Sequence, residues 1–167
     1  MRRLGIAGHR VLDPEACEFV AFTCSRLIAD ARRAGEVTAV SALAEGADML
    51  FAEAALSAGA TLEIVRPYDT YERDFQKGPA RQRYRALVAA ADRETRLPFA
   101  RRSTRAYEAA MCRVTDECDV LVAAWDGTPP RGTGGTADAI RYAERIGRPV
   151  VHLDVVRHLV TIRMADV

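Results

Sequence analysis

The chain has 167 residues, of which 49% are hydrophobic and 28% charged, and its formal net charge at pH 7 is +1. This balance is that of a globular protein and excludes a fibrous or a disordered chain. No stretch approaches the roughly 18 apolar residues of a membrane span, and the first apolar run is too short for a signal peptide. We therefore expect one domain over residues 1–167, cytoplasmic and with no membrane partner.

Four cysteines and three histidines are scattered along the chain. No Cys-x-x-Cys pair is present, and the spacings of His9, His152 and His158 are unrelated to those of metal ligands. The sequence therefore predicts no metal site, no cofactor, and reduced cysteines that pack as small apolar groups.

Short apolar runs alternate with helical patterns from the first residues to the last. Asp13 before Pro14 is typical of a helix start, and Gly35 and Gly59 stand where helical patterns end. Strands that alternate with helices predict parallel pairing, and hence an α/β fold: a single Rossmann-like three-layer sandwich with a mostly parallel sheet. The predicted strands cover residues 3–7, 37–43, 61–68, 94–98, 119–125 and 148–155. The predicted helices cover 14–34, about 46–58, 82–91, 103–117 and about 136–146.

The segment 66–105 is a basic excursion from this pattern. It holds 11 Lys and Arg against 5 Asp and Glu, so the rest of the chain carries an excess of negative charge. Such a segment suits a phosphate-bearing partner or an ordinary solvated surface, and both interpretations stay open.

In a sheet of this kind, ligands bind outside the carboxyl ends of the strands. The first loop there contains Gly8, His9 and Arg10, and it lacks the G-x-G-x-x-G pattern of dinucleotide binding. One interpretation is backbone approach to a phosphate at Gly8 with Arg10 as its charge partner. The other is a tight turn with a surface arginine.

The second loop, "SALAEGAD", joins the second predicted strand to its helix. Ser41 ends the strand and Gly46 lies near the first helical turn, so a hydroxyl and backbone N–H groups can face one anion. Asp48 has a simpler explanation, since the helix dipole stabilises an acid in the first turn of any helix.

The third loop, "WDGTPPRGTGGTADA", runs from Trp125 to Ala139 and is rich in glycine. Its glycines allow close backbone approach, and Thr136 starts a helix whose free N–H groups point above the sheet. The three loops together predict an anion site at one edge of the sheet. The predicted ligand-binding residues of this loop are Asp126, Gly127, Gly132, Gly134, Gly135 and Thr136.

At these residues the chain resembles the SLOG superfamily of Rossmann-like nucleotide binders, which includes the Lonely Guy phosphoribohydrolases and DNA-processing protein A. The resemblance is carried by "GHR", "SALAEGADMLFAEAAL" and the stretch from "DVLVAAW" to "RPVV". "SALAEGAD" is similar to the S-G-L-A-x-G-x-D of DNA-processing protein A, with Ala42 in place of the glycine. The resemblance implies a nucleotide or another ribose-phosphate ligand, and a homo-oligomer.

The third loop is also similar to the P-G-G-x-G-T-x-x-E of the phosphoribohydrolases and to the D-x-G-T-A-x-E of nucleoside deoxyribosyltransferases. In both, the glutamate three residues after the threonine carries the glycosidic chemistry, and here that position is Ala139. Cleavage of an N-glycosidic bond passes through a cationic sugar that needs a carboxylate, so the activity of these families is in doubt. The candidate replacement acids are Glu45, Asp69, Asp126 and Asp138.

Three functions stay open on the sequence. The first is binding of a nucleotide or a nucleotide-derived small molecule, as in a sensor, with Tyr68 against the base or the sugar. The second is an N-glycosidic hydrolase that uses an acid other than the missing glutamate. The third is single-stranded nucleic-acid binding by the basic segment and its aromatic residues, Tyr71, Phe75, Tyr84 and Phe99.

Overall fold

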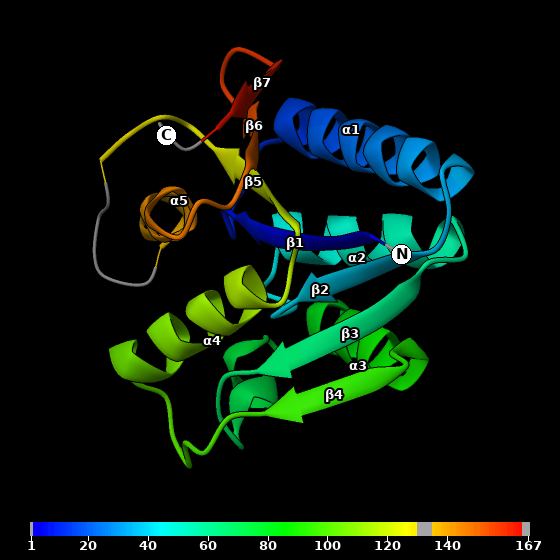
Figure 1. Cartoon of the computed structure of the whole chain (residues 1–167). Helices are drawn as coiled ribbons and strands as arrows, with labels where there is room; N and C mark the ends of the chain where they lie inside the picture. The colour runs from blue at the N-terminus through cyan, green and yellow to red at the C-terminus, as the bar shows by residue number, and fades with distance from the viewer. Residues whose placement is uncertain (1, 130–134, 165–167) are drawn as a thin grey trace.

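The computed structural model describes residues 2–129 and 135–164. Within them, a seven-stranded sheet has the order β4-β3-β2-β1-β5-β6-β7 (Figure 1). The strands are β1 (Arg2–Gly8), β2 (Val37–Ser41), β3 (Thr61–Arg66), β4 (Arg93–Arg96), β5 (Val120–Trp125), β6 (Val150–Asp154) and β7 (Leu159–Arg163). The helices are α1 (Pro14–Arg33), α2 (Ala47–Ser57), α3 (Pro79–Ala90), α4 (Thr104–Asp116) and α5 (Thr136–Arg145), and a short 3-10 helix, η1 (Tyr71–Asp74), precedes α3.

The helices form two layers around this sheet. α1, α2 and α3 lie on one face, and α4 and α5 on the other (Figure 1). Five pairs of neighbouring strands are parallel: β1·β2, β2·β3, β3·β4, β1·β5 and β5·β6. Strands β2 to β4 lie on one side of β1 and strands β5 to β7 on the other, so the strand order reverses between β1 and β5. The predicted fold, a Rossmann-like three-layer sandwich with a mostly parallel sheet, is confirmed.

Local sequence explains where the helices start. The Asp13 side chain accepts a hydrogen bond of 2.8 Å from the N–H of Ala16, and Pro14 is the first residue of α1. Ser103 caps α4 in the same way through the N–H of Ala106. The predictions of both helices are confirmed at these ends.

Two glycines of β1 set how closely the helices approach the sheet. A Cβ at Gly5 would lie 2.8 Å from Sγ of Cys118, which follows α4. A Cβ at Gly8 would lie 2.3 Å from Cβ of Ala47, the first residue of α2. Both glycines therefore have a packing role, on opposite helix layers, whatever else they do.

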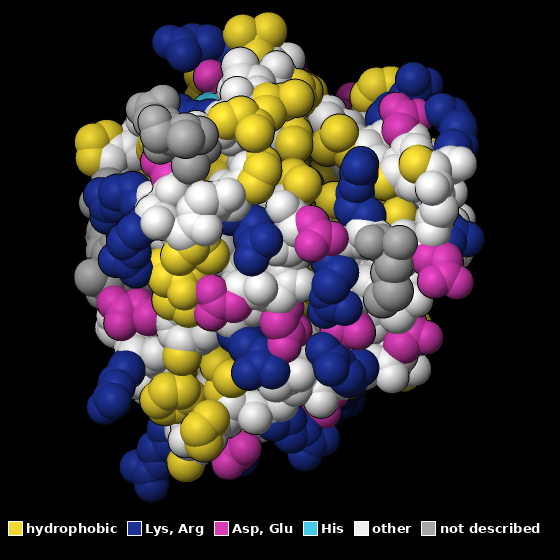
Figure 2. Space-filling view, viewed as in Figure 1, with side chains coloured by type: hydrophobic (Ala, Val, Ile, Leu, Met, Phe, Trp, Pro, Cys, Tyr) yellow, Lys and Arg dark blue, Asp and Glu magenta, His cyan; other side chains and the backbone are white. Residues whose placement is uncertain are grey.

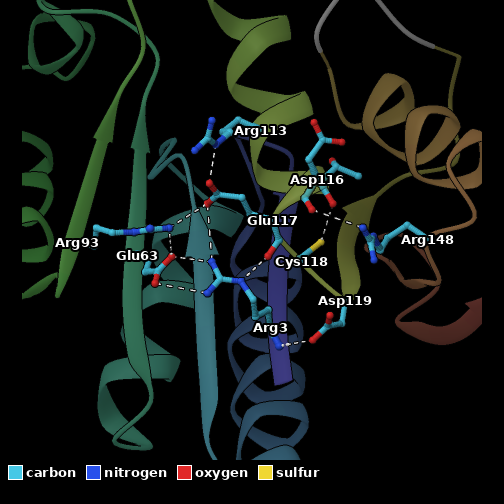
Figure 3. A network of polar contacts seen from close by, with 10 residues as sticks. Arg3, Glu63, Arg93, Arg113, Asp116, Glu117, Cys118, Asp119 and Arg148 are labelled. Atoms are coloured by element: carbon cyan, nitrogen blue, oxygen red, sulfur yellow. Dashed lines mark hydrogen bonds and ion pairs between the residues drawn. The ribbon is translucent and has the colours of Figure 1, made fainter. Parts of the chain in front are cut away.

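A network of charges ties the strands together near their amino ends (Figure 3). The Oε2 atom of Glu63 lies 2.6 Å from a guanidinium nitrogen of Arg3 and 2.6 Å from one of Arg93. Arg3 also donates to the backbone oxygen of Glu117 over 2.5 Å. The network joins β1, β3 and β4 to the end of α4, far from the carboxyl ends of the strands.

β7 runs antiparallel to β6 and is a strand that the sequence did not predict. Figure 2 shows hydrophobic side chains gathered over it at the top of the view. The exposed large hydrophobic residues of this region are Val156, Leu159, Val160, Ile162 and Met164. None of the helices in the described part of the chain has the length and apolarity needed to cross a membrane.

Candidate functional site

A cavity of about 400 Å³ opens at the carboxyl ends of the central strands. It lies where the strand order reverses, next to the ends of β1 and β5, which is where open α/β sheets bind ligands. Its size is within the range of small-molecule sites. The lining includes His9, Arg10, Asp48, Pro67, Tyr71, Tyr107, Ala110, Met111, Trp125, Thr128, Gly135, Thr136 and Ala139.

The first turn of α5 forms one wall of the cavity. Gly135 is its N-cap, with no side-chain hydrogen bond to the helix, and Thr136 and Ala137 follow it into the lining. The N–H groups of a first turn have no partner within their own helix, and the helix dipole makes this end attractive to anions. This wall can therefore hold a phosphate. Gly132 and Gly134, which were predicted to contribute, lie outside the described residues.

The loop after β1 brings Gly8, His9 and Arg10 to the cavity. His9 is fixed by its backbone, because its N–H donates to the Ala124 oxygen over 3.1 Å and its own oxygen accepts from the N–H of Ala47 over 3.1 Å. The carbonyl group of His9 thus occupies the N-terminus of α2, where the sequence predicted an anion.

Asp126 is a turn residue beside the cavity, outside its lining. Its Oδ1 atom accepts from the N–H and the hydroxyl of Thr128, over 2.9 and 2.8 Å, and lies 3.1 Å from Nε2 of His9. Burial acts to raise the pKa of Asp126, but these bonds outweigh it and lower the pKa to about 2. Asp126 is thus a fixed carboxylate that holds the turn, and Gly127, with φ of +80°, completes that turn.

The "SALAEGAD" segment lies under the cavity. Ser41 is fully buried, and its Oγ atom accepts from the N–H of Leu43 over 2.9 Å and lies 3.4 Å from Oδ2 of Asp48. Gly46 has φ of +87°, a value that favours glycine. Ser41, Glu45 and Gly46 are outside the lining, and Glu45 is exposed.

Ala42, Ala44 and Asp48 line the cavity, and of these three only Asp48 carries a charged group. Asp48 lies at the start of α2. It is 4% exposed, and Oδ2 accepts from the N–H of Ala44 over 3.3 Å. Burial raises the pKa of Asp48 to about 7, although the N–H of Ala44, the Ser41 hydroxyl and the Arg10 charge act against the rise. A carboxyl group that changes its charge near neutral pH therefore borders the cavity.

Aromatic side chains complete the wall. Tyr71 and Tyr107 line the cavity, whereas Tyr68, which was predicted to face a ligand, is buried behind them with its hydroxyl 3.1 Å from that of Tyr107. The Tyr107 hydroxyl also donates to Asp74. The sequence did not mark Tyr107, because its place on the apolar stripe of α4 is equally typical of a core residue.

The candidate acids of the third loop and its helix lie away from the cavity. Asp138 pairs with Arg141 and borders a second cavity between α4 and α5, while Ala139 is fully buried and lines the cavity at the carboxyl ends of the strands. One residue along a helix turns the side chain by about 100°. The cavity at the strand ends therefore meets a methyl group at the position where the resembling enzyme families carry glutamate.

Comparisons with known proteins agree with the fold. DNA processing protein A from Streptococcus pneumoniae matches with a TM-score of 0.68 and 18% identity, over 91% of this chain and 50% of that chain. The protein from Helicobacter pylori, described for its single-stranded DNA binding mode, matches with a TM-score of 0.62 and 20% identity, over 90% and 64%. The molybdenum cofactor binding protein from Rippkaea orientalis matches with a TM-score of 0.57 and 16% identity, over 90% and 75%.

This chain spans half of one DNA processing protein and less than two thirds of the other. No model of a protein family matches the sequence, and no curated protein matches it. The chain shares the Rossmann-like fold of these proteins, which is the fold that the sequence resemblance implied.

Proposed function

We propose that this chain binds a nucleotide or a related phosphorylated small molecule in the cavity at the carboxyl edge of the sheet. The observation that carries the proposal is the juxtaposition of the first turn of α5 with the aromatic wall of Tyr71 and Tyr107 around one cavity. The helix end offers N–H donors to a phosphate, and the partly exposed ring of Tyr107, with the buried Tyr71 packed edge-on against it, offers a surface to a flat base.

Arg10 supports an anionic ligand. Its side chain lies beside the phenols of Tyr71 and Tyr107, and its loop lines the cavity. A guanidinium group stays charged at any physiological pH and matches phosphate geometry. A ligand with a phosphate and a ring would use the charged and the apolar parts of this cavity together.

The names of the structural neighbours point to two ligand classes, single-stranded DNA and the molybdenum cofactor. For this chain, the observation against a DNA surface is the burial of the aromatic residues on which it would depend. Three of the four aromatic residues, Tyr71, Phe75 and Tyr84, are at most 2% exposed and pack against one another, and the fourth, Phe99, is partly buried. Stacking on single-stranded bases needs exposed rings, so a small molecule in the cavity is favoured.

The charges of the basic segment support the same choice. Figure 2 shows Lys and Arg interleaved with Asp and Glu over the lower half of the view. Arg83 pairs with Glu53 and Arg85 with Glu72, each over 2.5 Å. Paired arginines leave less free positive charge for a nucleic-acid backbone than the composition alone indicates.

An N-glycosidic hydrolase would need a carboxylate against the bound sugar. None of the candidate replacement acids, Glu45, Asp69, Asp126 and Asp138, lines the cavity. The acid that does line it, Asp48, follows β2 and is two strands away from the α5 N-terminus, which follows β5. The proposal is therefore binding without this chemistry, and release of free base from a nucleoside monophosphate would contradict that part of it.

The test is a thermal-shift and calorimetric screen of mononucleotides, dinucleotides, cyclic nucleotides and ribose phosphates. A ligand at about 100 times its Kd stabilises the folded state by about 2.7 kcal/mol, so the melting temperature should rise by several degrees. If no compound of this series shifts the wild-type protein, the proposal fails.

A matched pair of variants locates the site. Thr136→Glu places a negative charge at the first residue of α5, where it should repel a phosphate but stabilise the helix. Thr104→Glu makes the same change at the first residue of α4, which is outside the lining. We expect the ligand-induced shift to vanish in the first variant and to persist in the second.

A further inference from the structure

We propose that the ring of the ligand carries a 2-amino-4-oxopyrimidine edge, as in guanine and the pterins, and that Asp48 reads this edge. The inference rests on the proposed function, because it assumes a phosphorylated ligand in the same cavity. It adds the chemical class of the ring and the residue that selects it.

Asp48 is a buried acidic residue of the cavity lining. Among the described lining residues it is the only Asp or Glu, and it is 96% buried. Its Oδ2 atom accepts from the Ser41 hydroxyl at 3.4 Å and from the Ala44 N–H at 3.3 Å, and the backbone of Ala42 also stabilises the charged carboxyl group. The two contacts of Oδ2 are long, and a carboxylate has about four acceptor sites, so Asp48 retains acceptor capacity for a ligand.

The donors and acceptors along the edge of a ring decide whether a carboxylate can bind it. A carboxylate only accepts hydrogen bonds, so it favours a ring that presents two neighbouring N–H donors and disfavours one that presents ring acceptors. The guanine edge has the N1–H and the 2-amino group side by side, and pterins carry the same pair. Adenine presents a ring acceptor beside its amino group, and uracil places its single N–H between two carbonyls.

The order of the strands separates the two ends of such a ligand. Asp48 follows β2, the α5 N-terminus follows β5, and β1 lies between β2 and β5. Two strand spacings amount to roughly 10 Å, which leaves room for a sugar or a side chain between ring and phosphate. Gly8, at the end of β1, lines the cavity between them.

The charge of Asp48 then controls recognition. The groups that face it are Arg10 from the loop after β1, Cys24 from α1 and Tyr71 from η1. Burial raises the pKa of the Cys24 thiol to about 12 and that of Tyr71 well above its ordinary value, so both stay neutral near pH 7. Burial also raises the pKa of Asp48 to about 7, so affinity for a two-donor edge should grow as the pH rises through neutrality.

Calorimetry of the wild-type protein with GMP, IMP, AMP and XMP tests the edge, because the four share one sugar and one phosphate. We expect GMP to bind about tenfold or more tightly than IMP, which lacks the 2-amino group, and than AMP and XMP. The ratio of GMP to AMP affinity should increase from about pH 5.5 to about pH 8. Because AMP carries the same phosphate as GMP, the ratio removes the effect of phosphate titration on affinity. Neopterin phosphate, measured beside GMP, distinguishes a pterin from a guanine ligand.

Two variants test the residue. Asp48→Asn can donate as well as accept, so it should lose the preference for GMP and gain affinity for XMP. Glu15→Gln is the matched control, because Glu15 is also a first-turn acid, on α1, and is exposed outside the cavity. It should keep the preference for GMP.

The outcomes separate the two proposals. If neither a nucleotide nor neopterin phosphate binds the wild-type protein, the proposed function fails. If nucleotides bind with no preference for the two-donor edge, or if Asp48→Asn keeps the preference for GMP, the role of Asp48 is overturned and binding stands. If Asp48→Asn does not fold, the wild-type series and its pH dependence decide.

Discussion

A Cβ atom built on Gly46 would lie 2.4 Å from the backbone oxygen of His9. The next residue, Ala47, donates its N–H to the same oxygen over 3.1 Å. The loop after β1 and the start of α2 are thus in direct backbone contact. Because one carries Arg10 and the other Asp48, this contact fixes the spacing of two polar groups of the cavity.

Gly46→Ala should destabilise the protein by about 2–4 kcal/mol, because the new methyl group meets backbone at a positive φ. Gly59→Ala is the matched control, since Gly59 also has positive φ, at +67°, but has no neighbour within 4 Å of a Cβ. It should cost about 1 kcal/mol. Urea unfolding monitored by circular dichroism measures the free energy of unfolding of both variants. Equal losses would contradict the close backbone contact between Gly46 and His9.

Glu63→Gln should cost about 1–3 kcal/mol, because it removes the 2.6 Å ion pairs of Arg3 and Arg93 and leaves both with the longer ion pairs to Glu117, at 3.7 and 3.4 Å (Figure 3). The control is Asp30→Asn, which breaks the exposed pair with Arg33 and should change the free energy of unfolding by less than about 0.5 kcal/mol. Chemical denaturation compares them. Nucleotide affinity should not change in either variant, since both sites are outside the cavity lining.

Most of the fold could be predicted from the sequence, because caps, glycine stops and apolar runs are local signals. Asp13 and Ser103 cap the helices that were expected. β7 was missed for a physical reason. It is an exposed edge strand that pairs on one side only, so its residues show no alternation of buried and exposed positions. β4 was expected at 94–98 and begins at Arg93, because its register is set by pairing with β3.

The place of the site could also be predicted, since it follows from strand order, but its chemistry could not. The sequence explained Asp48 by the helix dipole alone, whereas the fold buries this residue beside a cavity. Tyr68 was expected to face the ligand, but Tyr107 lines the cavity instead, because packing between α4 and the segment that joins β3 to η1 decides which ring faces outward. Long-range contacts of this kind cannot be inferred from the spacing of residues along the sequence.

Asp126→Asn should lower stability at neutral pH by about 1 kcal/mol, after allowance for solvent screening. The pKa of Asp126 is lowered to about 2, below its ordinary 3.8, so its contribution is complete above about pH 4 and is lost as the pH falls toward 2. The difference between wild type and variant should therefore shrink in acid. Unfolding curves at about pH 6 and pH 3 measure this difference. A difference that grows in acid would contradict the stabilisation of the turn by the ionised Asp126 carboxylate.

Asp48→Asn should show the opposite pH dependence, because burial raises the pKa of Asp48 from 3.8 to about 7. The folded state favours the protonated carboxyl group, so the contribution of Asp48 is best below about pH 4, falls as the pH rises to about 7 and is level above it. Asparagine does not ionise, so its stability relative to wild type should increase across this window by up to about 4 kcal/mol. Urea unfolding of both proteins at about pH 5 and pH 8 measures the change, with Glu15→Gln as the exposed first-turn control. A relative stability that stays constant, or that falls as the pH rises, would show that the Asp48 carboxyl group ionises in its ordinary range.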